Sequence, residues 1–248
     1  RDVERSRGLG DVYKRQSKSG SGYTVDATKS VVPAGDAADA FLVPAQLDGK
    51  IALFLVERGA SGVSTQGYRT QDGSRAAELR CQAAPATLVT ADGLAALTLA
   101  QDAANAALCA EGVGAMEQTL KLTTEYMNQR KQFNTVIASF QALRHRVADM
   151  KMQLELARSM SYYASLKMSA ADAERHVAIA RAKVQLGQSL RFVGQQSVQL
   201  HGGIGVTDEY AGSHYFKRLT QMEMTGGDTL HHLGIVSAKM QDTAGVFA

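Results

Sequence analysis

The feature that most constrains the fold is a set of long segments in which apolar side chains recur every three or four residues. The clearest runs from about Ser139 to Met168 and keeps this spacing over about six turns. Such spacing places the apolar side chains on one face of a helix. Similar segments begin at about Leu94 and cover about Ala170–Leu200 and about Asp228–Asp242. Helices of this length pack against one another, so the sequence predicts an antiparallel four-helix bundle.

Residues 17–92 have a different pattern, in which short apolar or alternating runs are separated by the turn-forming stretches PAGDAAD and DGK. The runs that predict strands are Gly22–Val32, Ala40–Leu47, Ile51–Arg58, Gly62–Thr70 and Ala76–Ala84. Their spacing of roughly ten residues is typical of a meander, a sandwich or a small barrel. The predicted fold class is therefore α+β, with a small antiparallel β domain at 17–92 and a helical domain at 93–248.

The first segment, residues 1–16, is polar and aperiodic and matches neither half. One interpretation is a linker. The other starts from DVYKRQ at Asp11–Gln16, which is the translation of GAT-GTG-TAT-AAG-AGA-CAG, a sequence that resembles a transposase adaptor end. On that interpretation residues 1–16 are not native, and the chain is a fragment of a longer protein.

Composition excludes several classes of function. The 27 basic and 24 acidic residues leave a net charge of +3 with no basic block, which argues against nucleic acid as a partner. The sequence contains no run of about 18 apolar residues, which is the length that would predict a membrane span. Cys81 and Cys109 are far apart and have no CxxC spacing, which favours reduced structural thiols in a cytoplasmic protein. The six histidines do not form a ligand set, so no metal site is expected.

Two short stretches carry candidate binding chemistry. Arg130 stands at the end of the first long helix, followed by Lys131, Gln132 and Phe133. Such a group offers a planar fork for an anion, although basic residues at a helix C-terminus also complement the helix dipole. The stretch QLHGGIG breaks a later helix at 199–205. Glycines at such a break either cap the helix or let another molecule approach the bare backbone.

These stretches occur within longer motifs that resemble a known family. YMNQRKQF, FQALRHRVADM and QLHGGIGVTDEY are similar to the C-terminal half of acyl-CoA dehydrogenases, and TKSVVPAGDAADAFLV with TQDGSRAAEL resembles their middle domain. The resemblance covers about Gly20–Gly234 and is closest to the small subunit of pimeloyl-CoA-type bacterial dehydrogenases. It implies a fragment that lacks the N-terminal helical domain of the family.

The resemblance also implies an FAD shared between subunits. The matching cofactor-binding residues are Arg130, Gln132, Phe133, Gln141, Gln199, Gly202 and Gly203. Arg130 matches the arginine that holds the pyrophosphate of a neighbouring subunit's FAD, with Gln132 and Phe133 alongside, and Gln141 matches a glutamine near the adenosine. The loop that contains Gly202 and Gly203 matches the segment whose backbone approaches the dinucleotide.

The same resemblance predicts a degraded catalytic site. The α proton of an acyl-CoA must be removed by a base, and the two positions that supply a glutamate in the family match Gly226 and Asn105. Glu223 is a weak candidate for a shifted base, and a solvated helix carboxylate is the alternative interpretation. In the β domain, Pro33 replaces the threonine that hydrogen-bonds the flavin and has no N–H to donate.

The sequence therefore predicts an FAD-dependent acyl-CoA dehydrogenase subunit that completes the FAD site of a homologous catalytic partner in a heterotetramer. The resemblance implies acyl-CoA thioesters as substrates. Members of the family often use an electron-transfer flavoprotein as the electron acceptor, which the sequence itself does not identify. One alternative is a self-sufficient homotetramer that uses Glu223 or another, upstream residue as its base. A second alternative, from another class, is a helical assembly protein without flavin.

Overall fold

A computed structural model describes residues 16–19 and 22–244, so the interpretations of residues 1–15 lie outside the described residues. The chain divides into two compact units, Arg1–Ala100 and Gln101–Ala248. Each unit has its own buried core.

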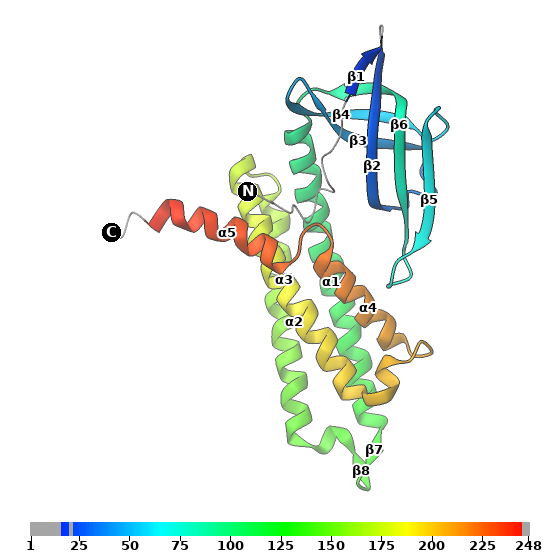
Figure 1. The fold of residues 1–248 in the computed structure, drawn as a ribbon. Coiled ribbons are helices and arrows are strands. Elements are labelled where there is room, and N and C mark those ends of the chain that lie inside the picture. Colours follow the sequence, from blue (N-terminus) through cyan, green and yellow to red (C-terminus); the bar gives the residue numbers. More distant parts are fainter. Residues whose placement is uncertain (1–15, 20–21, 245–248) are drawn as a thin grey trace, which may run out of the picture. The chain divides into compact units, whose positions relative to one another are not determined.

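The first unit is a six-stranded antiparallel sheet (Figure 1). Its strands are β1 (Gln16–Ser19), β2 (Gly22–Pro33), β3 (Ala40–Leu47), β4 (Lys50–Glu57), β5 (Val63–Arg69) and β6 (Arg75–Thr90). The strand order is β1-β2-β6-β4-β3, and β5 also pairs with β6. Alternate residues of β3 are buried, as the period of a half-buried strand requires, and these side chains join Phe54 and Leu79 in the core of the unit.

The longest strand, β6, is shared by three others. Its first part pairs with β2 and β5, whereas its last residues pair with β4. Within the ladder to β2, at the register shift between Cys81 and Ala84, Ala83 has a φ of 46°, and its N–H donates to the Asp26 carboxylate at 2.7 Å. An irregularity of this kind bends a strand without ending it. For this reason β6 continues to Thr90, six residues beyond the predicted end of the run at Ala84.

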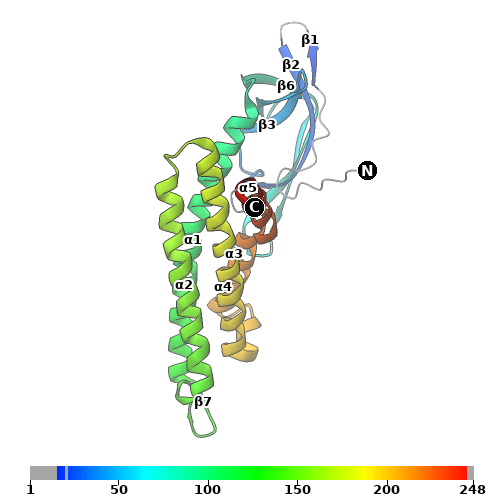
Figure 2. The ribbon, with the colours of Figure 1, turned by 90° about the vertical axis from the view of Figure 1, so that its left-hand side faces the viewer.

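The second unit is built from packed helices (Figures 1 and 2). The α-helices are α1 (Gly93–Gln129, which begins in the first unit), α2 (Gln141–Lys167), α3 (Asp172–His201), α4 (Ala211–Met224) and α5 (Thr229–Ala244). Short elements at the helix ends are β7 (Lys131–Gln132), β8 (Thr135–Val136), η1 (Ile137–Ser139) and η2 (Gly202–Val206). The apolar faces predicted for α2 and α3 form one core with residues of α1, with Met116, Leu154 and Leu190 almost completely buried, whereas none of the described residues of α5 belongs to this core.

Helix α3 is the centre of this unit, because it packs against α2, α4 and α5. Two glycines on α3 allow close approach of its neighbours. A Cβ at Gly187 would lie 2.2 Å from the Thr229 hydroxyl at the start of α5, and one at Gly194 would lie 3.1 Å from the ring of Phe216 on α4. Helices α4 and α5 therefore pack against α3 at different glycines, α5 at Gly187 and α4 at Gly194.

The predicted order of an antiparallel β-sheet followed by packed helices is confirmed. The described residues form one α-helix, α4, in addition to the four that the sequence predicted. It was missed because its segment contains Gly212 and Ser213 at its start and follows the glycine-rich break. Strand β1 was also missed, since its residues QSKS lack apolar alternation. Within the described residues, no helix is both long enough and apolar enough to span a membrane.

Candidate functional site

Arg130 lies where α1 meets a short hairpin. Its N–H donates to the Tyr126 carbonyl at 2.8 Å, and its own carbonyl accepts from Ile137 N–H at 2.8 Å. The two residues at the hairpin turn, Phe133 and Asn134, have φ values of 51° and 61°. Positive φ at both central residues is the geometry of a tight two-residue turn. The Arg130 side chain is exposed, and its guanidinium makes no hydrogen bond or ion pair with the described residues.

Three other predicted residues gather near Arg130. Phe133 is 88% exposed, and its ring stands edge-on to Phe140 with the ring centres 6.1 Å apart. Gln132 is exposed on β7, and Gln141 is exposed as the first residue of α2. The end of α1, the hairpin and the start of α2 therefore present a cation, a ring and amide groups together to the outside of this chain.

The glycine-rich break forms η2 directly after α3, and its glycines serve different purposes. Gly202 has a φ of 63° and ends the helix. Gly205 is buried, and a Cβ there would lie 3.0 Å from the Val198 carbonyl oxygen, so packing within the chain accounts for it. A Cβ on Gly203 would contact no described residue within 4 Å and its φ is not positive, so the described part of the chain does not explain that glycine. Gln199, one turn earlier on α3, is exposed.

A partly buried aromatic network fixes this loop to the end of α1. His201 Nδ1 lies 2.8 Å from the Ser197 carbonyl oxygen, so this nitrogen carries the proton of the neutral ring. His201 Nε2 then accepts from the Tyr210 hydroxyl at 2.8 Å, while the Tyr126 hydroxyl donates to the His201 carbonyl at 3.2 Å. Burial lowers the pKa of His201 and raises the pKa of Tyr210. Both side chains are thus held neutral. The hydrogen bonds of this network connect the glycine-rich break to the end of α1, where Arg130 lies.

Sequence reasoning did not single out Tyr126, His201 or Tyr210. All three lie within the quoted motifs, at four residues before Arg130, directly before Gly202, and at the end of the sequence VTDEY. A polar aromatic residue beside each candidate binding residue was the available signal.

The two positions that match a catalytic base lie in contact with each other. Asn105 on α1 is buried, and its Nδ2 donates to the Gly226 carbonyl at 3.3 Å. Gly226 follows α4 and has a φ of 69°. Neither position supplies an ionisable side chain.

Glu223 is not a solvated carboxylate, as the alternative interpretation assumed. It is 7% exposed, and its Oε1 accepts from Arg191 at 2.9 Å and from the Thr229 hydroxyl at 2.8 Å. These contacts join the end of α4 to α3 and to the first residue of α5. The carboxylate is therefore engaged in holding helices together.

In the first unit, Pro33 is the last residue of β2 and lies opposite Ala76 of β6. The preceding bulge contains Val31, which has a φ of 54° and whose N–H donates to the Tyr68 hydroxyl at 3.1 Å. A positive φ is uncommon for a β-branched residue. The edge that the resemblance assigns to the flavin thus differs from the family pattern in sequence and is locally irregular.

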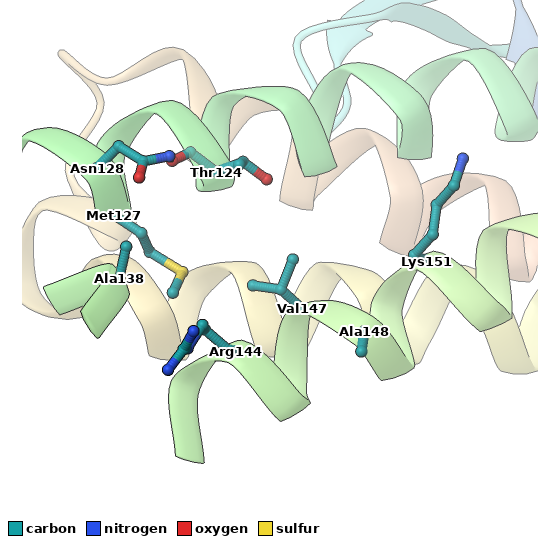
Figure 3. Close-up of a pocket in the computed structure, with 8 residues that line it drawn as sticks. All are labelled: Thr124, Met127, Asn128, Ala138, Arg144, Val147, Ala148 and Lys151. Carbon is teal, nitrogen blue, oxygen red and sulfur yellow. The ribbon is translucent and has the colours of Figure 1, made fainter. Parts of the chain in front are cut away.

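A separate groove lies between α1 and α2 (Figure 3). Its volume is about 520 Å³, and its lining residues are Thr124, Met127, Asn128, Ala138, Arg144, Val147, Ala148 and Lys151. None of the predicted site residues lines it. Among the described residues, no group of three or more His, Cys, Asp or Glu side chains could hold a metal ion.

Comparison with known proteins gives the family. The acyl-CoA dehydrogenase C-terminal domain profile matches residues 91–241, which is more than half of the chain. The chain belongs to the acyl-CoA dehydrogenase family.

Individual relatives support this membership. The acyl-CoA dehydrogenase FadE27 of Mycobacterium tuberculosis is 27% identical over 243 residues, covering 95% of this chain and 65% of that protein. The acyl-CoA dehydrogenase IpdE2 of the same organism is 38% identical over 117 residues, covering 47% of this chain and 35% of that protein. The chain thus spans less than two thirds of the length of each of these relatives.

Among solved structures, a chain of the ChsE4-ChsE5 complex from Mycobacterium tuberculosis superposes with a TM-score of 0.85 at 26% identity. The superposition covers 94% of this chain and 64% of that one. That neighbour is a complex of two differently named proteins.

Proposed function

We propose that this chain is a subunit of an FAD-dependent acyl-CoA dehydrogenase and that it helps to bind the FAD of a neighbouring subunit. The observation that carries the proposal is the exposed Arg130 guanidinium, which has no partner among the described residues. An arginine held at a fixed helix end, with its fork unpaired, is suited to a pyrophosphate, because two parallel N–H donors match its oxygens.

The surrounding residues are compatible with a dinucleotide. Gly203 leaves open space in front of the backbone, which would let a phosphate approach a main-chain N–H. Gln132, Gln141 and Gln199 are exposed amides that can both donate and accept hydrogen bonds. When bound, FAD would supply the acceptor for the hydride that leaves the β carbon of the acyl-CoA.

We further propose that the chain does not supply its own base. Removal of the α proton needs a group that can accept it, and neither Gly226 nor Asn105 can do so. A homologous subunit with an intact carboxylate would then carry out the reaction, with an electron-transfer flavoprotein as the acceptor. The two-protein composition of the ChsE4-ChsE5 neighbour favours such a heteromer. A self-sufficient homotetramer is less well supported, since Glu223 would have to leave Arg191 and Thr229.

Replacing Arg130 with alanine in the full-length chain, assembled with its partner subunit, is expected to weaken FAD binding by about 10- to 150-fold. This range corresponds to about 1.5–3 kcal/mol for a lost charge-assisted hydrogen bond. The measurement is titration of the apoprotein with FAD, followed by flavin fluorescence.

Arg158→Ala is the matched control, because Arg158 is an arginine of α2 that pairs with Glu117 and Glu155 on the helix surface. This control should retain the native affinity for FAD. If Arg130→Ala also retains it, the proposed role of Arg130 is wrong. If the native assembly binds no flavin, the assembly protein without flavin is the better description.

A further inference from the structure

The loop between α4 and α5 is anchored to the rest of its unit through one backbone oxygen. The Gly226 carbonyl accepts from Gln101 Nε2 at 3.2 Å, from Asn105 Nδ2 at 3.3 Å and from His232 Nε2 at 3.0 Å. Gly226 and Gly227 have φ values of 69° and 103°. These left-handed conformations aim the carbonyl at α1, and they favour glycine at both positions.

The three donors leave two buried acceptors without partners. Because His232 Nε2 donates to the Gly226 carbonyl, Nδ1 of the neutral ring has a lone pair and no proton. Asn105 uses its Nδ2 as the donor, so its Oδ1 is likewise an acceptor. Both Asn105 Oδ1 and His232 Nδ1 are buried and have no hydrogen-bond partner among the residues that the structure describes. Buried acceptors of this kind are costly to leave unpaired, so the three hydrogen bonds to the Gly226 carbonyl are formed at the expense of two unpaired acceptors.

The position of Asn105 Oδ1 shows what the arrangement fills. A Cβ built on Gly226 would lie 2.2 Å from this oxygen and 3.1 Å from Asn105 Cγ. A separation of 2.2 Å is far inside van der Waals contact. The amide of Asn105 therefore occupies the space into which any side chain at position 226 would have to extend.

We propose that Asn105 and Gly226 form a mutually exclusive pair, in which the Asn105 amide positions the α4–α5 loop and thereby prevents position 226 from holding a carboxylate. This inference rests on the proposed function in one respect, namely that positions 105 and 226 are the two places where the family carries its base. In this chain, position 226 therefore lacks both a carboxylate and the space to hold one. The Asn105 side chain on α1 fills the volume that a base at position 226 would need. A carboxylate can therefore be introduced at position 226 only when the Asn105 side chain is removed.

A double-mutant cycle in the full-length assembled protein tests the pair. The variants are Gly226→Ala, Asn105→Ala and both together, and the measured quantity is the thermal midpoint of the helical unit. Gly226→Ala alone should lower Tm by about 8 °C or more, because it adds a steric clash to an unfavourable φ. With Asn105→Ala already present, the same substitution should lower Tm by only about 2–4 °C, the cost of the φ alone.

Gly202→Ala, measured without added flavin, is the matched control, because Gly202 lies in the same unit, has a φ of 63°, and a Cβ there would contact none of the described residues within 4 Å. It measures the cost of the backbone conformation without a clash. If Gly226→Ala fails to fold while the double variant folds, the pair is supported. Equal costs of Gly226→Ala in the two backgrounds, or a double variant that fails to fold where Asn105→Ala folds, overturn the inference.

A second measurement separates this inference from the proposed function. A glutamate at position 226 would take the α proton of an acyl-CoA, and return of a deuteron from solvent D₂O would leave the thioester otherwise unchanged. In the flavin-loaded assembly, with the base carboxylate of the partner subunit replaced by an amide, Asn105→Ala with Gly226→Glu should exchange the α hydrogen at least tenfold faster than the same assembly without these two substitutions, and Gly226→Glu alone should not. Coupled stabilities without this gain would keep the pair and refute position 226 as a base position.

Discussion

Replacing Asp102 with alanine is expected to lower the free energy of unfolding of the helical unit by about 3–5 kcal/mol, the range for removing one member of a buried ion pair. The Asp102 carboxylate on α1 is 1% exposed. It accepts from Arg175 Nε at 3.1 Å and lies 2.9 Å from His176 Nδ1, both on α3. Without the carboxylate, the charge of Arg175 would lose its buried partner and α1 would lose a polar link to α3.

Asp172→Ala is the control for this effect, because Asp172 binds the same guanidinium at 2.9 Å but has a side chain that is 84% exposed. An exposed pair contributes less than about 1 kcal/mol. Denaturant titration followed by far-ultraviolet circular dichroism reports on the helices and leaves the β unit largely silent. Equal losses in the two variants would show that burial of the Asp102 carboxylate is not what makes the contact strong.

The stability of the helical unit is expected to fall as the pH is lowered from about 6.5 towards about 4, through protonation of His232. Burial, with a further contribution from the charge of Lys183, lowers the pKa of His232 from 6.5 to about 4. His231 and His176 also face it and act in the same direction, while its hydrogen bond to Gly226 opposes them. Between these pH values the unfolded chain binds a proton that the folded chain does not, so stability rises with pH. The full effect is on the order of 3 kcal/mol.

His232→Gln removes this titration and keeps a side-chain donor near Gly226, so the variant should lose less stability than the native protein over the same pH interval. Denaturant midpoints measured at several pH values give the comparison. His145→Gln is the matched control, because it removes an exposed imidazole from α2. A native profile that runs parallel to that of His232→Gln would contradict the assignment.

The helices and strands with strong apolar periodicity were predictable. The predicted strand Ala40–Leu47 agrees with β3 at both ends, because each of its buried residues is apolar and the flanking residues form turns. The end of β6 was not predictable, since it depends on the Asp26 side chain accepting from Ala83. The hairpin after α1 was also missed. Phe133 adopts a positive φ, a conformation for which a phenylalanine gives no local signal.

The residues of the candidate site were predictable only where they lie in a motif shared with the family. Arg130 and Gly203 could be chosen from the resemblance, and their exposure keeps them candidates. The residues that position them could not be chosen in this way. The contact between Tyr210 and His201 depends on how η2 folds back on α3, and the contact between Asn105 and Gly226 joins positions 121 residues apart. Such pairings arise from tertiary packing, which periodicity along one segment does not contain.

The pairing of β6 with three other strands has a consequence for the dynamics of the first unit. Around Leu79 and Cys81, strand β6 cannot open without breaking its ladders to β2 and β5 at the same time, whereas among the described strands β3 is bonded to β4 alone. Amide hydrogens that open only with the whole unit exchange with solvent most slowly. The amides of β6 around Leu79 and Cys81 should therefore be the last of the sheet to exchange, and the outer strands should exchange first.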